Sequence, residues 1–376
     1  MMDSNPVTAR SLGKTYFVNG DNLERSYKHV LSGFSQWEQL AHAEDWALLA
    51  ENMGTHLSID ETSIDHEVYV FLTNKDGHGK KKTLVAYVKG LKVADIVEIL
   101  MKIPESLRLA VVEVTMDHSD VMHAVVSKVF PNARITIDCF HSVQIVGDAP
   151  EEIRMQCKRE AVKEEKKEKT AFKKRLLGNA KQRKRYAEKH PRNYKGRKRG
   201  RKPMRANAKY IPTTLSNGDT PIDLLRKCRN MLLQSGEKWT DKQKERATVL
   251  FEKYPKIKEA HSLLCSFRAI FKNKTLTPAT AKIELHKWYD KVSKSSLREV
   301  KAARDTIKLK EEEVLNYFVE FSTNASAESF NSKVKNFRAQ LHGVIDVKFF
   351  MYRLCCIWDS YIHGTMQVRR SSSSPR

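Results

Sequence analysis

Every strand-like pattern in this chain of 376 residues lies between residues 56 and 140. The segments with such a pattern are 56–63, 67–74, 83–89, 109–116 and 134–140. Alternation of apolar and polar residues predicts β-strands, because successive side chains of a strand point to opposite faces of the sheet. No strand signal returns after residue 146, so the sheet must be built from the first part of the chain alone.

The predicted strands follow one another in an order that restricts the topology. Helical patterns at 93–101 and 119–130 separate the last three strands, which gives the order β-β-β-α-β-α-β. Three antiparallel strands that lead into right-handed crossovers form the topology of a ribonuclease-H-like domain. We therefore expect an α/β fold with a mixed five-stranded sheet of this type.

The rest of the sequence has helical or irregular patterns. Residues 22–53 are predicted to form helices, and 151–189 a long charged helix. Amphipathic helices are expected over 221–320, where aromatic residues such as Trp239 and Trp288 are interpreted as core, and a helical pair over 325–341 and 346–362. The Pro/Gly/Arg-rich stretch 190–210 is predicted to be a flexible basic loop.

The net charge of +23 is concentrated in one segment. Residues 158–209 contain 23 Lys and Arg against 5 acidic residues. A local block of this kind favours a phosphate-binding surface for DNA, although a solvated helix followed by a disordered loop is the alternative. The predicted DNA contacts are Lys184, Arg185, Arg197, Lys198, Arg199, Arg201 and Lys202.

The six cysteines form no C-x-x-C pair and no zinc-finger spacing. No apolar run is long enough for a signal peptide core or a membrane span. These features predict reduced thiols and a cytoplasmic protein, associated with the chromosome and not with a membrane.

Two predicted strands end in an acidic residue. Asp60 follows Leu57-Ser58-Ile59, and Asp117 follows Val112-Glu113-Val114-Thr115-Met116. In the predicted topology these strands are adjacent and parallel, so both carboxylates are expected at the same edge, where a divalent cation would offset their repulsion.

A third acid is predicted on a helix far along the chain. Between Asn324 and Arg338, polar residues recur every three or four positions, and an apolar stripe that includes Phe330 and Val334 lies on another face. Docking through this stripe would leave Glu328 able to reach a metal held by Asp60 and Asp117.

Each acid also has an ordinary structural interpretation. Asp60 can be a surface residue at a strand end, Asp117 the N-cap of the next helix, and Glu328 a first-turn acid favoured by the helix dipole. Four other acids are near enough to compete for these roles: Glu61, Asp65, Glu113 and Asp120.

These motifs resemble the ISL-three family of bacterial insertion-sequence transposases. The similarity extends over five segments: 57–63, 112–117, 130–141, 238–240 and 324–335. The resemblance implies that the Asp-Asp-Glu triad of the family falls on Asp60, Asp117 and Glu328. Asp138 and His141 are similar to a D-x-x-H motif of related transposases and would be support or DNA-contact residues.

Some assignments within these motifs remain open. Asp138 is the main rival of Asp117 as second ligand, and Cys139 and His141 can instead continue the apolar face of Ile135 and Ile137. Asn331 and Lys335, which follow Glu328 in its motif, are further candidates for support of the site.

The resemblance also implies an organisation of the chain. The stretch between the second Asp and the Glu would be a large all-α insertion that interrupts the catalytic core. The predicted parts are a helical lead-in (1–55), the first part of the core (56–145), the basic insertion (146–321), the helix that completes the core (322–366) and a flexible tail (367–376). Many relatives begin with a DNA-reading zinc-binding and helix-turn-helix element, but only about 55 residues precede the first predicted strand here. Either the chain is a fragment, or a separate DNA-reading partner protein is expected.

The hypothesis from the sequence is a transposase that cuts and rejoins double-stranded DNA at transposon ends and target. Two Mg²⁺ ions, for which Mn²⁺ could substitute, would be held by the three acids. A homo-oligomer on DNA is expected by analogy. The alternatives are a ribonuclease-H-like nuclease or resolvase without strand transfer, and an inactive DNA-binding remnant of a transposase.

Overall fold

The computed structural model describes residues 1–190 and 209–358. These residues divide into two compact units. The first unit contains Met1–Ser142, Asn273–Ile283 and the chain from Ile307 onward, and the second contains Val143–Lys272 and Glu284–Thr306. The segment 191–208 and the chain from 359 onward lie outside the described residues. The first of these segments contains the predicted DNA contacts Arg197, Lys198, Arg199, Arg201 and Lys202, and the second contains the predicted tail 367–376.

The first unit is built on a mixed six-stranded sheet with the order β1-β4-β3-β2-β5-β6. Its strands are β1 (Trp46–Leu48), β2 (His56–Ile64), β3 (Glu67–Asn74), β4 (Leu84–Lys89), β5 (Glu113–Met116) and β6 (Arg134–Ile137). β2, β5 and β6 run parallel to one another, whereas β1, β4, β3 and β2 pair antiparallel. The prediction that the first and fourth strands of the pattern are adjacent and parallel is therefore confirmed.

Three sequence predictions about the strands were wrong in part. Trp46–Leu48, predicted as helix, forms the edge strand β1, because a short apolar run does not distinguish a helix from a strand. The sheet therefore has six strands and not the predicted five. The strand predicted over 109–116 begins only at Glu113, since Glu105–Leu109 forms the short helix α4. The strand predicted over 134–140 ends at Ile137, because the helix α6 begins at Cys139.

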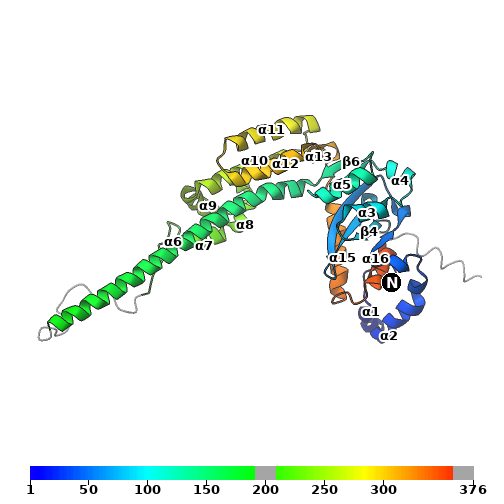
Figure 1. Ribbon diagram of the computed structural model, residues 1–376, viewed down its shortest axis with the longest axis horizontal. Coiled ribbons are helices and arrows are strands. Elements are labelled where there is room, and N and C mark those ends of the chain that lie inside the picture. The colour runs from blue at the N-terminus through cyan, green and yellow to red at the C-terminus, as the bar shows by residue number, and fades with distance from the viewer. Residues whose placement is uncertain (191–208, 359–376) are drawn as a thin grey trace, which may run out of the picture. The chain divides into compact units, whose positions relative to one another are not determined.

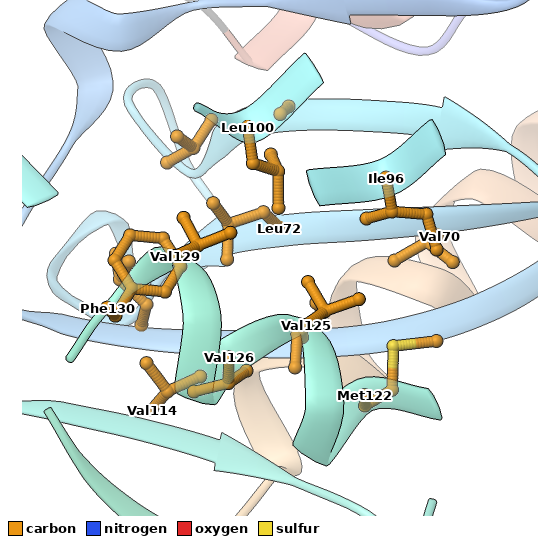
Figure 2. Close-up of a cluster of buried hydrophobic side chains, with 14 of the residues drawn as sticks. Val70, Leu72, Ile96, Leu100, Val114, Met122, Val125, Val126, Val129 and Phe130 are labelled. Atoms are coloured by element: carbon orange, nitrogen blue, oxygen red, sulfur yellow. The ribbon is translucent and has the colours of Figure 1, made fainter. Parts of the chain in front are cut away.

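One face of the sheet is covered by α3 (Val93–Leu100) and α5 (Asp120–Val129). Leu57, Ile59 and Val114 of the strands pack with apolar residues of both helices in one buried cluster. Figure 2 shows Ile96 and Leu100 of α3 and Val125 and Val129 of α5 directed toward this face. Because side chains alternate along a strand, Ser58, Asp60, Thr115 and Asp117 point to the other face.

The other face is covered by α15 (Ala325–Gln340) and α16 (Val347–Trp358), as Figure 1 shows. The predicted apolar stripe of α15 docks here, since Phe330, Val334 and Phe337 are fully buried against residues of β3, β4 and α16. α1 (Ala9–Tyr16) and α2 (Gly20–Ser26) belong to the N-terminal region, whose apolar residues pack on the far side of α16. The short helices α13 (Glu311–Leu315) and α14 (Tyr317–Glu320) precede α15.

All regular secondary structure among the described residues of the second unit is helical. Most of α6 (Cys139–Lys189) lies in it, and this helix confirms the long charged helix predicted over 151–189. The other helices of the unit are α7 (Pro221–Lys227), α8 (Arg229–Leu232), α9 (Asp241–Lys253), α10 (Pro255–Lys272), and parts of α11 (Pro278–Lys294) and α12 (Arg298–Leu309). Trp288 is buried, and its indole N–H donates to the Leu263 carbonyl, so its interpretation as a core residue is confirmed.

No helix within the described part of the chain is both long enough and apolar enough to cross a membrane.

Candidate active site

Three aspartates form a row across the parallel strands. β2 pairs with β5 in the register Ser58↔Thr115, and continuing this register by two residues sets Asp60 opposite Asp117. β5 pairs with β6 in the register Met116↔Ile137, so the next residues, Asp117 and Asp138, are also neighbours. The row lies on the face of the sheet that α15 covers.

Helix α15 contacts both acids that the strands were predicted to bring together. The side-chain amide of Asn331 donates to Asp60 Oδ2 at 2.8 Å, and that of Asn324 donates to Asp117 Oδ1 at 3.1 Å. Glu328 lies four residues after Asn324 and three before Asn331, so the three residues share one face of the helix. The structure therefore brings Glu328, whose side chain is exposed, to the same side of the sheet as Asp60 and Asp117.

His141 connects two of the aspartates. Its Nε2 lies 3.0 Å from Asp117 Oδ2, and its Nδ1 lies 3.2 Å from Asp138 Oδ2. Asp138 is fully buried, and it also accepts a hydrogen bond from the backbone N–H of Asn324 at 3.3 Å. The alternative in which Cys139 and His141 continue the apolar face of β6 was wrong, because these residues belong to α6.

The carboxylates influence one another electrostatically. Burial and the charge of Asp60 raise the pKa of Asp117 to about 6. The pKa of Asp60 is raised as well, because burial opposes its ionisation more than its hydrogen bonds favour it. The pKa of His141 is raised by its hydrogen bond to Asp138 and by the charges of Asp117, Asp138 and Glu328, so Glu328 is near enough to act on the site.

The positions of these acids decide among the competing interpretations. Ser119, not Asp117, caps α5, since its side chain accepts a hydrogen bond from the Met122 N–H. Glu61 and Asp65 are exposed, and Asp120 forms an ion pair with Lys310. Glu328 does lie in the first turn of α15, so its interaction with the helix dipole remains compatible with either role.

The acid row has the chemistry of a site for a divalent cation. Among the described residues, the only basic side chain that contacts Asp60, Asp117 or Asp138 is His141, and no Lys or Arg forms an ion pair with them. Each oxygen of Asp60 and Asp117 has one hydrogen-bond or ion-pair partner, which leaves a second lone pair for a ligand bond. Asp117, Asp138 and His141 also offer ligand atoms within 4.8 Å of one another. Carboxylate oxygens and an imidazole nitrogen in this arrangement fit a divalent metal.

A second acidic cluster differs from the first in its charge balance. His56, Glu113 and Glu320 also lie close together, near the start of β5. The buried carboxylate of Glu113 is bound by Lys75 at 3.3 Å and Arg134 at 3.1 Å, and Arg134 also contacts Glu320. These cations already neutralise the cluster, so it has the properties of a structural ion-pair network.

The remaining predicted site residues lie outside this row. Lys335 is exposed on α15, four residues after Asn331 and on the same helix face. Lys184 and Arg185 are exposed on α6, in the second unit.

Asn324 and Thr115 were absent from the predicted site, although both contact its acids or their neighbours. The polar spacing of Asn324, Glu328 and Asn331 was visible in the sequence and could have identified Asn324. The position of Thr115, two residues before Asp117 on the same strand, was a weaker signal, because it has meaning only once the register of β2 and β5 is known.

Asp117 and Asp138 directly follow β5 and β6, whereas Asp60 lies within β2 and not at its end as predicted, because β2 continues to Ile64. A cluster of carboxylates on neighbouring parallel strands, open to divalent cations, is typical of metal-dependent enzymes. The chain belongs to the ISL-three family of DDE transposases, since the model of this family, described as transposase, matches residues 57–202 and 205–354. Comparisons with curated proteins and with solved structures gave no match. Membership of this family implies an enzyme that acts on DNA.

Proposed function

We propose that this protein catalyses metal-dependent cleavage and transfer of DNA strands at the ends of an insertion sequence, with Asp60, Asp117 and Glu328 as its metal-ligating acids. The observation that carries the proposal is the position of α15. Two asparagines of this helix hold Asp60 and Asp117, and Glu328 lies between them on the same face. If Glu328 only stabilised the first turn of its helix, it would not need to lie on the face that carries Asn324 and Asn331.

The cofactor in this proposal is a pair of Mg²⁺ ions, for which Mn²⁺ could substitute. When bound, such ions activate the attacking hydroxyl and stabilise the leaving 3′ oxygen of the phosphodiester. The three acids supply oxygen ligands, and Glu328 supplies the one that solvent reaches most easily. Asp138 and His141 support the site: the buried Asp138 carboxylate orients the imidazole, and the imidazole in turn holds Asp117.

Asp138 is an alternative second ligand in this proposal, since it lies in the same row and shares His141 with Asp117. Its complete burial and its bonds to His141 and the Asn324 N–H favour a supporting role over direct ligation. Lys335, exposed on the same helix face, is positioned to contact a DNA phosphate beside the acids.

The sheet order supports a ribonuclease-H-like core in which residues 146–321 form an inserted helical region. β2, β3 and β4 form an antiparallel meander, and β5 and β6 extend it in parallel. The exposed basic residues of α6, including Lys184 and Arg185, support sequence-independent binding of double-stranded DNA by this region. We further propose that the protein acts as a homo-oligomer on DNA and that a separate protein reads the terminal repeats.

The test uses the full chain and a duplex that carries the DNA flanking its reading frame. Wild type is expected to nick this duplex with Mg²⁺ or Mn²⁺, and to join a pre-cleaved 3′-OH end to a target duplex. Asp60→Asn, Asp117→Asn and Glu328→Gln should each abolish both reactions. Glu61→Gln is the matched control, because it removes an exposed carboxylate from the position after Asp60.

The outcomes separate the proposal from its alternatives. Cleavage without joining would indicate a nuclease or resolvase. If Glu328→Gln cleaved as fast as wild type, while Asp60→Asn and Asp117→Asn were inactive, the assignment of the third acid would be wrong. Equal inactivity of wild type and Asp117→Asn with both metals would indicate a DNA-binding remnant.

A further inference from the structure

Asn324 is a buried residue at the N-cap of α15 whose side chain does not cap the helix. An asparagine at this position commonly accepts a hydrogen bond from a backbone N–H in the first turn. Here its side chain makes no such bond and is turned toward the strand ends instead. The local stabilisation of the helix is therefore given up for contacts elsewhere.

Those contacts use every polar group that Asn324 directs toward the strands. The amide Nδ2 donates to Asp117 Oδ1 at 3.1 Å, and the backbone N–H donates to Asp138 Oδ1 at 3.3 Å. The amide Oδ1 lies 3.4 Å from Thr115 Oγ1. The orientation of the amide follows from chemistry, because an ionised carboxylate can only accept hydrogen bonds and the NH₂ group must face it.

Thr115 extends this connection to β2. Its hydroxyl lies 2.7 Å from the hydroxyl of Ser58, and both residues are fully buried. Thr115 has one hydroxyl hydrogen, so donation by Ser58 to Thr115 leaves that hydrogen to be shared between Asn324 Oδ1 at 3.4 Å and the Leu57 carbonyl of β2 at 3.3 Å. Through this chain, Asn324 is tied to both of the strands that carry Asp60 and Asp117.

Glu328 follows Asn324 by one helical turn, and its backbone N–H donates to the Asn324 carbonyl at 3.1 Å. The chain between Asp117 and Glu328 is long, so the covalent connection alone does not fix the position of one acid relative to the other. Noncovalent contacts of α15 with the strands have to do this. We propose that Asn324 is a positioning residue that sets the carboxylate of Glu328 relative to Asp117 and Asp138. This inference rests on the proposed function of the three acids.

Loss of a residue that orients a metal ligand lowers metal affinity about 10–100-fold. Asn324→Ser is the most informative change, because serine is a good N-cap but its side chain has no amide to donate to Asp117. We expect the thermal stability of this variant to be close to that of wild type. Its affinity for Mn²⁺, measured by electron paramagnetic resonance of the free ion, should fall about 10–100-fold, and its cleavage rate should fall with it.

The matched control is Asn336→Ser, which changes an exposed asparagine of the same helix. This variant should bind Mn²⁺ and cleave DNA as wild type does. The inference is overturned if Asn324→Ser, folded, has the Mn²⁺ affinity of wild type.

A second pair of variants tests the inference without altering Asn324. Thr115→Val removes the hydroxyl but keeps the branched shape, and Thr115→Ser keeps the hydroxyl. Positioning through the hydroxyl predicts weaker Mn²⁺ binding for Thr115→Val and near wild-type binding for Thr115→Ser. A packing role for the methyl group predicts the reverse order and would overturn the inference, even if Asn324→Ser failed to fold.

The same titrations separate a failure of this inference from a failure of the proposed function. If wild type bound no Mn²⁺, or if Asp117→Asn bound it equally well, the metal site itself would be refuted. If wild type bound Mn²⁺ and Asp117→Asn did not, while Asn324→Ser resembled wild type, the acids would stand and only the role of Asn324 would be refuted.

Discussion

Asp117→Asn should make the metal-free protein more stable while it abolishes DNA cleavage. The pKa of Asp117 is raised from its ordinary value of 3.8 to about 6 by burial and by the charge of Asp60. Each pKa unit corresponds to about 1.36 kcal/mol, so the ionised carboxylate costs the folded chain about 3 kcal/mol. This cost is a net value that already includes the attraction of His141, and because the Asp117 side chain is partly exposed, solvent screening reduces it. We therefore expect a net gain of about 1–2 kcal/mol at pH 7.5.

The sign of the effect determines its pH dependence. Because the folded pKa of Asp117 lies above the unfolded value, wild type loses stability as pH rises from about 4 to about 6. The variant lacks this titration, so its advantage should be near zero at pH 4 and fully developed above pH 6.5. Below pH 4 the carboxyl group is protonated in both states of the wild type, and the two proteins should not differ through this group.

The assay is urea denaturation in EDTA across this pH range, followed by tryptophan fluorescence, with Glu61→Gln as the control for removal of an exposed charge. The exposed carboxylate of Glu61 should change the unfolding midpoint little. A variant that is less stable than wild type at pH 7.5, or an advantage that does not change with pH, would refute the electrostatic reasoning.

Three further predictions concern the metal, the ion-pair network and the basic helix. Mn²⁺ at 100 times its dissociation constant should stabilise wild type by about 2.7 kcal/mol, and Asp60→Asn should lose most of this gain. The measurement is thermal unfolding with and without Mn²⁺. Equal stabilisation of both proteins would exclude the acid row as the binding site. Glu113→Gln should destabilise the first unit by about 2–4 kcal/mol, because Lys75 and Arg134 lose a buried partner. Burial opposes the ionisation of Glu113, but hydrogen bonds from Ser322 and Thr136 and the charge of Lys75 lower its pKa overall. In urea denaturation, the difference in unfolding free energy between wild type and Glu113→Gln should therefore shrink as pH falls below 4.5. Changing both Lys184 and Arg185 to Ala should reduce the slope of log affinity for DNA against log salt concentration, measured by filter binding. The reduction should be up to about 0.9 for each phosphate that the variant no longer neutralises. An unchanged slope would exclude these residues from the DNA-binding surface.

Much of the sheet and part of the site could be predicted from local patterns. The strand-like patterns located β2, β3 and β4 almost to the residue, because strand runs and the turn residues between them are local signals, even though β3 and β4 are buried on both faces. The apolar stripe of α15 was visible for the same reason, since Phe330, Val334 and Phe337 repeat at helical spacing and are all buried. The acids at positions 60, 117 and 328 were identified as candidates from these patterns, although Asp60 lies within β2 and only Asp117 directly follows its strand.

Strand ends and the edge strand β1 could not be predicted in the same way. Short apolar runs such as Trp46–Leu48 fit a helix or a strand equally, and pairing with β4 decides between them. The change from β6 to α6 at Cys139 moved His141 from a strand face to a helix turn, where it meets Asp117 and Asp138.

Local patterns therefore identified the elements and the acids, because the period of side chains along a strand or helix is a property of neighbouring residues. Which acids meet was decided by the register between β2, β5 and β6 and by the docking of α15, since these contacts join residues that are far apart in the chain. The orientation of Asn324 is the clearest case. Its position next to a helix predicts a cap, and only the packed sheet beneath it turns its amide toward Asp117.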